Sequence, residues 1–152
     1  MFYVASSIIV IFVYDVKHYL IPDAVLFPAT IIVFLYRLVF NFNGLIFNYA
    51  LAVLIASGFF LAIYLVSKGR WMGFGDVKLA ILLGLILGFP DILAGLFLAF
   101  LFGAIIGLGA IFFKKKGLKS EIPFGPFLII GTFLAMLWGQ QIMNWYVSFF
   151  VL

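Results

Sequence analysis

The sequence predicts an all-α membrane protein, a polytopic bundle of about six transmembrane helices. Hydrophobic residues make up 68% of the 152-residue chain and charged residues only 9%, whereas a soluble domain usually carries about 25% charged residues. So few charges do not cover a water-facing surface, and the solvent around most of the chain must therefore be lipid. The apolar runs are continuous instead of alternating with polar residues, which excludes a membrane β-barrel.

Six apolar segments are separated by short polar or turn-forming breaks. A helix needs about 20 residues to cross the roughly 30 Å of hydrocarbon in a bilayer. No internal repeat or linker divides the chain, so residues 1–152 are expected to form a single transmembrane domain. The helices are expected at about 1–19, 24–42, 45–66, 76–89, 92–113 and 124–151.

The basic residues indicate how the segments are oriented. If all six segments cross the bilayer, the first, third and fifth breaks share one side, and the other side holds only Arg37. This asymmetry places the basic side in the cytoplasm and the chain in the cytoplasmic (inner) membrane. It also accounts for the net charge of +4 without a nucleic-acid partner. The basic residues of the shared side are Lys17, Lys68, Arg70, Lys78, Lys114, Lys115, Lys116 and Lys119.

Several kinds of chemistry are excluded by residues that the chain lacks. It has no cysteine, and therefore no disulfide, no thiolate metal site and no cysteine nucleophile. A single histidine, His18, excludes a zinc site with several histidine ligands. Neither a metal nor a cofactor is therefore expected.

Two of the five carboxylates indicate a functional site. Asp15 ends an uncharged apolar run at the N-terminus, and Asp76 begins the run that ends at Phe89. At 1.5 Å per residue each aspartate lies about 21 Å from the outer end of its helix, so both sit at a similar depth below the cytoplasmic face. A carboxylate at such a depth is costly and indicates a function. The alternative is a pair of interfacial residues neutralised by Lys17 and Lys78.

The other three carboxylates have simpler explanations. Asp23 and Asp91 each follow a proline and precede an apolar run, which is typical of a helix N-cap. Glu121 is the only acidic residue of the fifth break. It either helps to receive a basic segment of a substrate or forms a solvated pair with Lys119.

Two glycines precede Asp76 in the run Gly73-Phe74-Gly75-Asp76-Val77-Lys78-Leu79. Glycine allows close backbone approach and unusual torsion angles, which an extended substrate needs beside an attacking group. The run has neither the third glycine nor the preceding strand of a dinucleotide-binding fingerprint. Lys17 and Lys78 are interpreted as membrane anchors, and the alternative is that they tune the two carboxylates or hold a substrate carboxylate.

Three motifs resemble those of the type IV prepilin peptidases, a family of GxGD intramembrane aspartic proteases. Gly73-x-Gly75-Asp76-x-Lys78-Leu79 looks like the GxGD motif, and Asp15-x-Lys17-x-x-x-Ile21-Pro22-Asp23 resembles the first aspartate motif. Ile122-Pro123-Phe124-Gly125-Pro126-Phe127 resembles the segment that opens the last helix in the bacterial branch. The motifs occur in the family's order and reach from the first helix to the last.

This resemblance implies an aspartic endopeptidase that cuts type IV prepilins or pseudopilins after a glycine at the end of a short basic leader. The alternatives are another GxGD protease, similar to presenilin or signal peptide peptidase, and a non-enzymatic transporter or assembly scaffold. Long bacterial members carry an N-terminal segment with paired cysteines that is linked to N-methylation. This chain has no cysteine, so cleavage without methyl transfer is expected. The implied catalytic dyad is Asp15 and Asp76, and the supporting or substrate-binding residues are Gly73, Gly75, Lys17, Lys78, Asp23 and Glu121.

Overall fold

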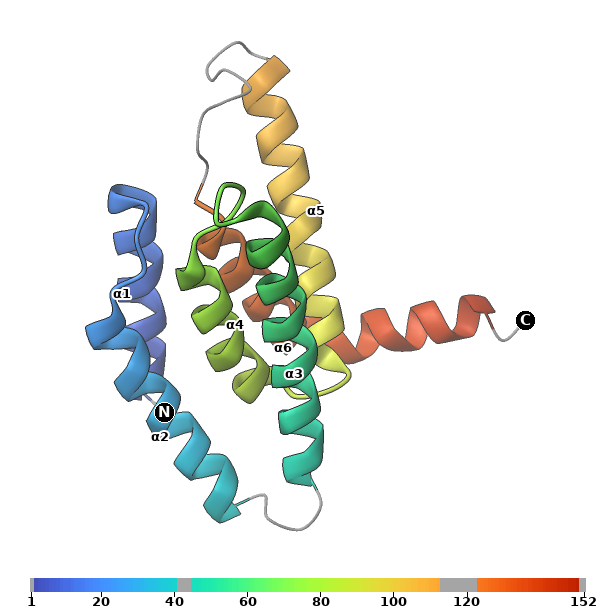
Figure 1. The fold of residues 1–152 in the computed structure, drawn as a ribbon. Coiled ribbons are helices and arrows are strands. Elements are labelled where there is room, and N and C mark those ends of the chain that lie inside the picture. The colour runs from blue at the N-terminus through green and yellow to red at the C-terminus, as the bar shows by residue number, and fades with distance from the viewer. Residues whose placement is uncertain (1, 41–44, 113–122, 151–152) are drawn as a thin grey trace.

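Six α-helices make up the described part of the chain, which comprises residues 2–40, 45–112 and 123–150 of a computed structural model (Figure 1). No strand occurs in these ranges, which confirms the predicted all-α class. Each helix agrees with a predicted segment to within two residues at either end. In chain order the helices are α1 (Phe2–His18), α2 (Asp23–Phe40), α3 (Leu45–Ser67), α4 (Phe74–Leu87), α5 (Asp91–Phe112) and α6 (Gly125–Phe150).

The protein is a multi-pass membrane protein, and the helices that carry Asp15 and Asp76 are the two shortest of the described helices. Among the described helices, α2, α3, α5 and α6 are long and apolar enough to cross a membrane. The 17 residues of α1 and the 14 of α4 correspond to about 26 Å and about 21 Å, less than the roughly 30 Å of the hydrocarbon core. Asp15 lies about 20 Å along α1 from Phe2, and Asp76 about 17 Å along α4 from Leu87. These two lengths are similar, and a common depth of the two aspartates below the cytoplasmic face stays a prediction.

The short helix α4 lies at the centre of the bundle, packed against α2, α3, α5 and α6 (Figure 1). Its side chains Leu79, Leu82 and Leu83 are fully buried. A helix that is apolar on all sides is stable when other elements surround it. The central position therefore places Asp76 in the protein interior instead of against lipid.

Aromatic side chains pack the start of α6 against its neighbours. Many large apolar residues of the described ranges are exposed on the outside of the bundle, where lipid is the expected solvent. Phe60 of α3, in contrast, is fully buried. Its ring centroid lies 6.0 Å from that of Phe100 on α5 and 5.8 Å from that of Phe124. Phe100 and Phe124 are themselves 4.9 Å apart. This cluster helps to fix the position of Gly125, the first residue of α6.

Arg37, the basic residue predicted for the far side of the membrane, binds the end of α4. Its Nε donates to the carbonyl of Leu85 at 3.1 Å and its Nη2 to that of Ile86 at 2.7 Å. The guanidinium also lies 4.1 Å from the centre of the Tyr49 ring. The last carbonyls of a helix have no intrahelical partner and form its negative end. Arg37 therefore satisfies the end of α4 opposite to Asp76.

We expect Gly131→Ala to destabilise the protein, because Gly131 lets α6 contact the backbone of α5. A Cβ atom at this position would overlap the carbonyl oxygen of Gly95 and lie 2.8 Å from the amide nitrogen of Ala99. Overpacking of this kind costs about 1–3 kcal/mol of unfolding free energy. Unfolding midpoints in detergent measure the effect. The matched control is Gly109→Ala, whose added Cβ meets nothing within 4 Å, and equal midpoints for the two variants would contradict the expectation.

Candidate active site

Two aspartates from different helices lie close together in the protein interior. Asp15 is in the last turn of α1 and Asp76 in the first turn of α4. Their relative exposures are only 4% and 8%, and they are near enough for the charge of Asp15 to act on Asp76. Two adjacent buried carboxyls are costly to keep ionised. The fold thus brings together the two aspartates that the sequence singled out as a pair.

Asp76 is held by the backbone at the start of its own helix. The amide of Gly73, the residue before α4, donates a hydrogen bond to the Asp76 carboxyl. The Gly73 carbonyl accepts one from the Asp76 amide at 3.2 Å. The first of these contacts is one half of a capping box, and the second is a backbone turn, because Gly73 has no side chain to complete the box. Gly73 has φ −74° and ψ 150°, which any residue adopts, so the expectation of unusual torsion angles at Gly73 is wrong.

Asp15 lies against the backbone of Gly125, the first residue of α6. A Cβ atom on Gly125 would overlap Oδ2 of Asp15 and lie 3.2 Å from its Cγ. The Gly125 amide is directed at this carboxyl, but the buried Oδ2 has no hydrogen-bond partner among the described residues. A buried polar atom without a partner is costly and is typical of a functional group. In the sequence Gly125 is part of the motif that opens the last helix, and no role was predicted for it.

Asp23 and Lys78 form an ion pair that links the starts of α2 and α4. The Lys78 Nζ lies 2.6 Å and 2.9 Å from the two carboxyl oxygens of Asp23. The N-cap interpretation of Asp23 is wrong, because the Pro22 carbonyl accepts the first hydrogen bonds of α2, from Val25 and Leu26. The ammonium of Lys78 thus binds a carboxylate of the protein, and its predicted role as a membrane anchor stays a prediction.

Of the two remaining predicted supporting residues, the structure describes only Lys17. Lys17 is exposed near the end of α1 and, within the described ranges, forms no ion pair. Glu121 lies outside the described residues. Asp91 begins α5, at the other end of α4 from Asp76. Lys17 and Asp91 therefore add nothing to the geometry that the structure describes around the two buried aspartates.

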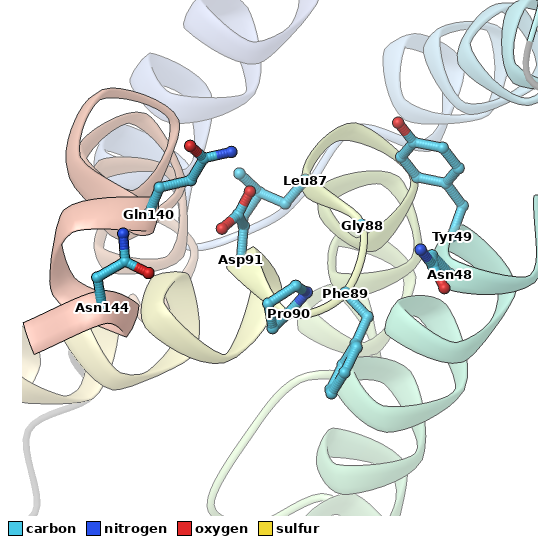
Figure 2. A pocket seen from close by; sticks show the side chains of 9 residues that line it. All are labelled: Asn48, Tyr49, Leu87, Gly88, Phe89, Pro90, Asp91, Gln140 and Asn144. Carbon is cyan, nitrogen blue, oxygen red and sulfur yellow. The ribbon is translucent and has the colours of Figure 1, made fainter. Parts of the chain in front are cut away.

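A polar cavity of about 400 Å³ lies at that other end of α4. Figure 2 shows Asp91, Gln140 and Asn144 on one side of it and Asn48 and Tyr49 on the other. Its lining includes one carboxyl and no histidine, so it offers no pair of groups for acid–base chemistry. In the part of the chain that the structure describes, no three His, Cys, Asp or Glu residues gather to hold a metal ion. The buried aspartate pair is therefore the candidate active site.

Known proteins resemble this chain over most of its length. The model of the type IV leader peptidase family matches residues 2–108. A relative from Legionella pneumophila is 34% identical over 144 residues, covering 90% of this chain and 49% of the relative. Relatives from Aeromonas hydrophila (32% over 140 residues, 90% and 48%) and Bacillus subtilis (30% over 144 residues, 94% and 57%) are similar.

All three relatives are named prepilin leader peptidase/N-methyltransferase. The chain spans about half the length of these curated relatives. No solved structure is significantly similar to it. The family match ends at residue 108, so the contact between Asp15 and Gly125 is known from the tertiary structure alone.

Proposed function

The chain belongs to the type IV leader peptidase family, and from this we propose that it is an aspartic endopeptidase that removes the leader peptide from type IV prepilins or pseudopilins. The observation that carries the proposal is the buried pair of Asp15 and Asp76. Family membership supports the peptidase activity, and the carboxyl pair supports the aspartic type. We assign the activity to residues 1–152 as one membrane-embedded domain.

Peptide hydrolysis by this pair needs only water and one shared proton. Two adjacent buried carboxyls hold one negative charge more readily than two, so one is ionised and the other is protonated. The ionised carboxyl takes a proton from water as the water oxygen attacks the scissile carbonyl carbon, and the protonated carboxyl donates to the carbonyl oxygen. When the C–N bond breaks, the leaving amine takes a proton from the pair. Either aspartate can take either part, because the pair titrates as a unit.

The aspartate pair is proposed to lie near the cytoplasmic face of the inner membrane. Lys17 follows Asp15 by two residues, and Lys68 and Arg70 precede the helix that carries Asp76. Basic residues accumulate on the cytoplasmic side of membrane proteins. A basic leader peptide approaches from this side, and Glu121 remains the predicted acceptor of its charge. Gly73 supports the dyad through its backbone contact with the Asp76 carboxyl.

We expect this chain to cleave prepilin without transferring a methyl group. The N-methyltransferase in the names of the relatives belongs to proteins of which the chain spans about half. Residues 1–152 contain no cysteine, and the family resemblance links methylation to a segment with paired cysteines. The measurement is the mass of mature pilin after incubation with this chain and S-adenosylmethionine. A methyl group added to the new terminal residue, in an amount that depends on this chain, would contradict the expectation.

A cleavage assay tests the proposed function. Purified chain in detergent is incubated with a prepilin that carries a short basic leader, and both products are identified by mass. Cleavage at the leader junction that persists with a metal chelator and is absent with the Asp15→Asn/Asp76→Asn double variant supports the proposal. No cleavage by the folded wild-type chain favours a transporter or scaffold. Cleavage within the membrane helix of the substrate favours another kind of GxGD protease.

A further inference from the structure

Helix α2 is bound to α4 by polar contacts at both of its ends. At its start, the two carboxyl oxygens of Asp23 accept hydrogen bonds from the Lys78 Nζ at 2.9 Å and 2.6 Å. In its last turn, Arg37 donates to the carbonyls of Leu85 and Ile86. The first contact lies near the start of α4 and the second at its end. The position of α2 on α4 is therefore fixed along the whole of α4.

Helix α1, which carries Asp15, is connected to α4 mainly through α2. Among the described helices, α1 packs against α2 and α6 and makes little direct contact with α4. The linker from α1 to α2 is fixed at both ends, because the Tyr19 amide donates to the Asp15 carbonyl at 2.9 Å and the Pro22 carbonyl accepts the first hydrogen bonds of α2. The position of Asp15 relative to Asp76 thus depends on where α2 lies on α4.

The Ile21 side chain connects this linker to the surroundings of both carboxyls. It is buried, and its Cβ lies 3.2 Å from the position of a Cβ on Gly75, the residue before Asp76. Its Cδ1 lies 3.5 Å from the position of a Cβ on Gly125, which lies against the Asp15 carboxyl. Close-packed contacts of this kind transmit a displacement to their neighbours. A movement of the linker would therefore be felt at both aspartates.

We propose that Asp23 and Lys78 are positioning residues, whose ion pair sets the spacing of the two catalytic aspartates. The inference rests on the proposed function. Lys78 follows Asp76 by two residues, and side chains two apart on a helix do not face each other, so Lys78 acts on the site through Asp23. The side chains of Lys78 and Asp23 are 24% and 50% exposed, and an exposed ion pair adds little stability. The contribution of the pair is therefore to the geometry of the site.

The first test measures kcat and KM for prepilin cleavage in Asp23→Asn, Lys78→Met and the double variant. Each replacement nearly keeps the size of the side chain and removes its charge. A catalytic group misplaced by about 1 Å costs on the order of 100-fold in rate, so a smaller shift in each single variant is expected to lower kcat about tenfold with KM little changed. The double variant is expected to be no slower than either single one, since all three lose the same contact. Lys78→Arg still binds a carboxylate and is expected to retain most of the wild-type kcat.

Arg37→Lys is the matched control, because it weakens the other contact between α2 and α4. Lysine cannot reproduce the two-pronged hydrogen bonds of the Arg37 guanidinium. This contact begins at Leu85, about 14 Å along α4 from Asp76 by the helical rise. The control is therefore expected to lower the unfolding midpoint in detergent and to keep the wild-type kcat per folded molecule.

A second test does not depend on cleavage. Residues 1–152 contain no cysteine, so Ile21→Cys/Gly75→Cys introduces the only two thiols. Their Cβ positions are 3.2 Å apart, close to the separation of about 3.8 Å in a disulfide. The rate of disulfide formation under mild oxidation measures how firmly the linker is held against the start of α4. This rate is expected to fall severalfold when Asp23→Asn is added and to stay unchanged when Arg37→Lys is added.

A wild-type kcat in folded Asp23→Asn overturns the inference. A much larger loss in Lys78→Met than in Asp23→Asn also overturns it, because Lys78 would then act directly on the carboxyls or the substrate. An equal loss of kcat in Arg37→Lys overturns it as well, since the effect would then come from general packing of the bundle. If the wild-type chain cleaves no prepilin, the proposed function is contradicted and the inference falls with it, whereas unchanged cross-linking in a chain that cleaves overturns the inference alone.

Discussion

Asp15→Asn and Asp76→Asn are each expected to lower kcat/KM for prepilin cleavage by about 1,000-fold or more. Asparagine has nearly the size of aspartate, but it neither ionises nor shares a proton, so the attacking water is not activated. Both single variants are expected to fail alike, because the two buried carboxyls act as a unit. The measurement is the cleavage rate at equal amounts of membrane-inserted protein, with the unfolding midpoint recorded for each variant.

Asp91→Asn is the matched control for the dyad variants. Asp91 is also at the start of a helix, but it follows the far end of α4, and α4 extends about 17 Å from Asp76 to Leu87 by the helical rise. It lines the separate polar cavity (Figure 2), and its variant is expected to cleave at the wild-type rate. Substantial cleavage by either dyad variant would refute the assignment. Loss of cleavage in a stable Asp91→Asn protein would move the active site to the cavity.

Gly125→Ala is expected to lower kcat about 100-fold while the protein stays folded in the membrane. The added Cβ would overlap Oδ2 of Asp15, so either the carboxyl turns away or the start of α6 moves outward. A displacement of a catalytic group by about 1 Å costs on the order of 100-fold in rate. The phenylalanine cluster that packs Phe124 against α3 and α5 resists the outward movement. In Gly125→Ala the Asp15 carboxyl is therefore expected to move, and α6 is expected to stay in place.

Gly58→Ala is the control for this variant. It adds the same methyl group to a helix, but its Cβ meets nothing within 4 Å, so its rate and unfolding midpoint are expected to match the wild type. The comparison uses kcat at saturating substrate together with the fraction of folded protein. A Gly125→Ala enzyme with normal kcat per folded molecule would show that Gly125 serves helix packing alone.

The positions of the helices and the two candidate aspartates could be predicted without the structure. An apolar run of bilayer length needs no tertiary partner to become a helix, since lipid leaves the backbone no other hydrogen-bond acceptor than its own carbonyls. The ends of all six helices could therefore be predicted to within two residues. Asp15 and Asp76 were recognisable for a similar reason, because a carboxylate inside an apolar run is conspicuous whatever surrounds it.

The contacts that the charged residues make with distant parts of the chain could be seen only in the tertiary structure. The two partners of the Asp23–Lys78 ion pair are 55 residues apart, and Arg37 binds a carbonyl 48 residues away. Such contacts depend on how helices pack, and no local pattern of apolar and charged residues encodes them. For the same reason a torsional role was predicted for Gly73, although its torsion angles are ordinary.

The positions of Ile21 and Gly125 show the same limit at the active site. A glycine in a sequence indicates that a side chain is absent, but only the packed structure shows what occupies the vacated space. Here that space holds the Asp15 carboxyl and the end of the Ile21 side chain. The contact of Gly125 with Asp15 depends on how the ends of α1, α4 and α6 pack together (Figure 1). The sequence of each helix alone does not specify this packing.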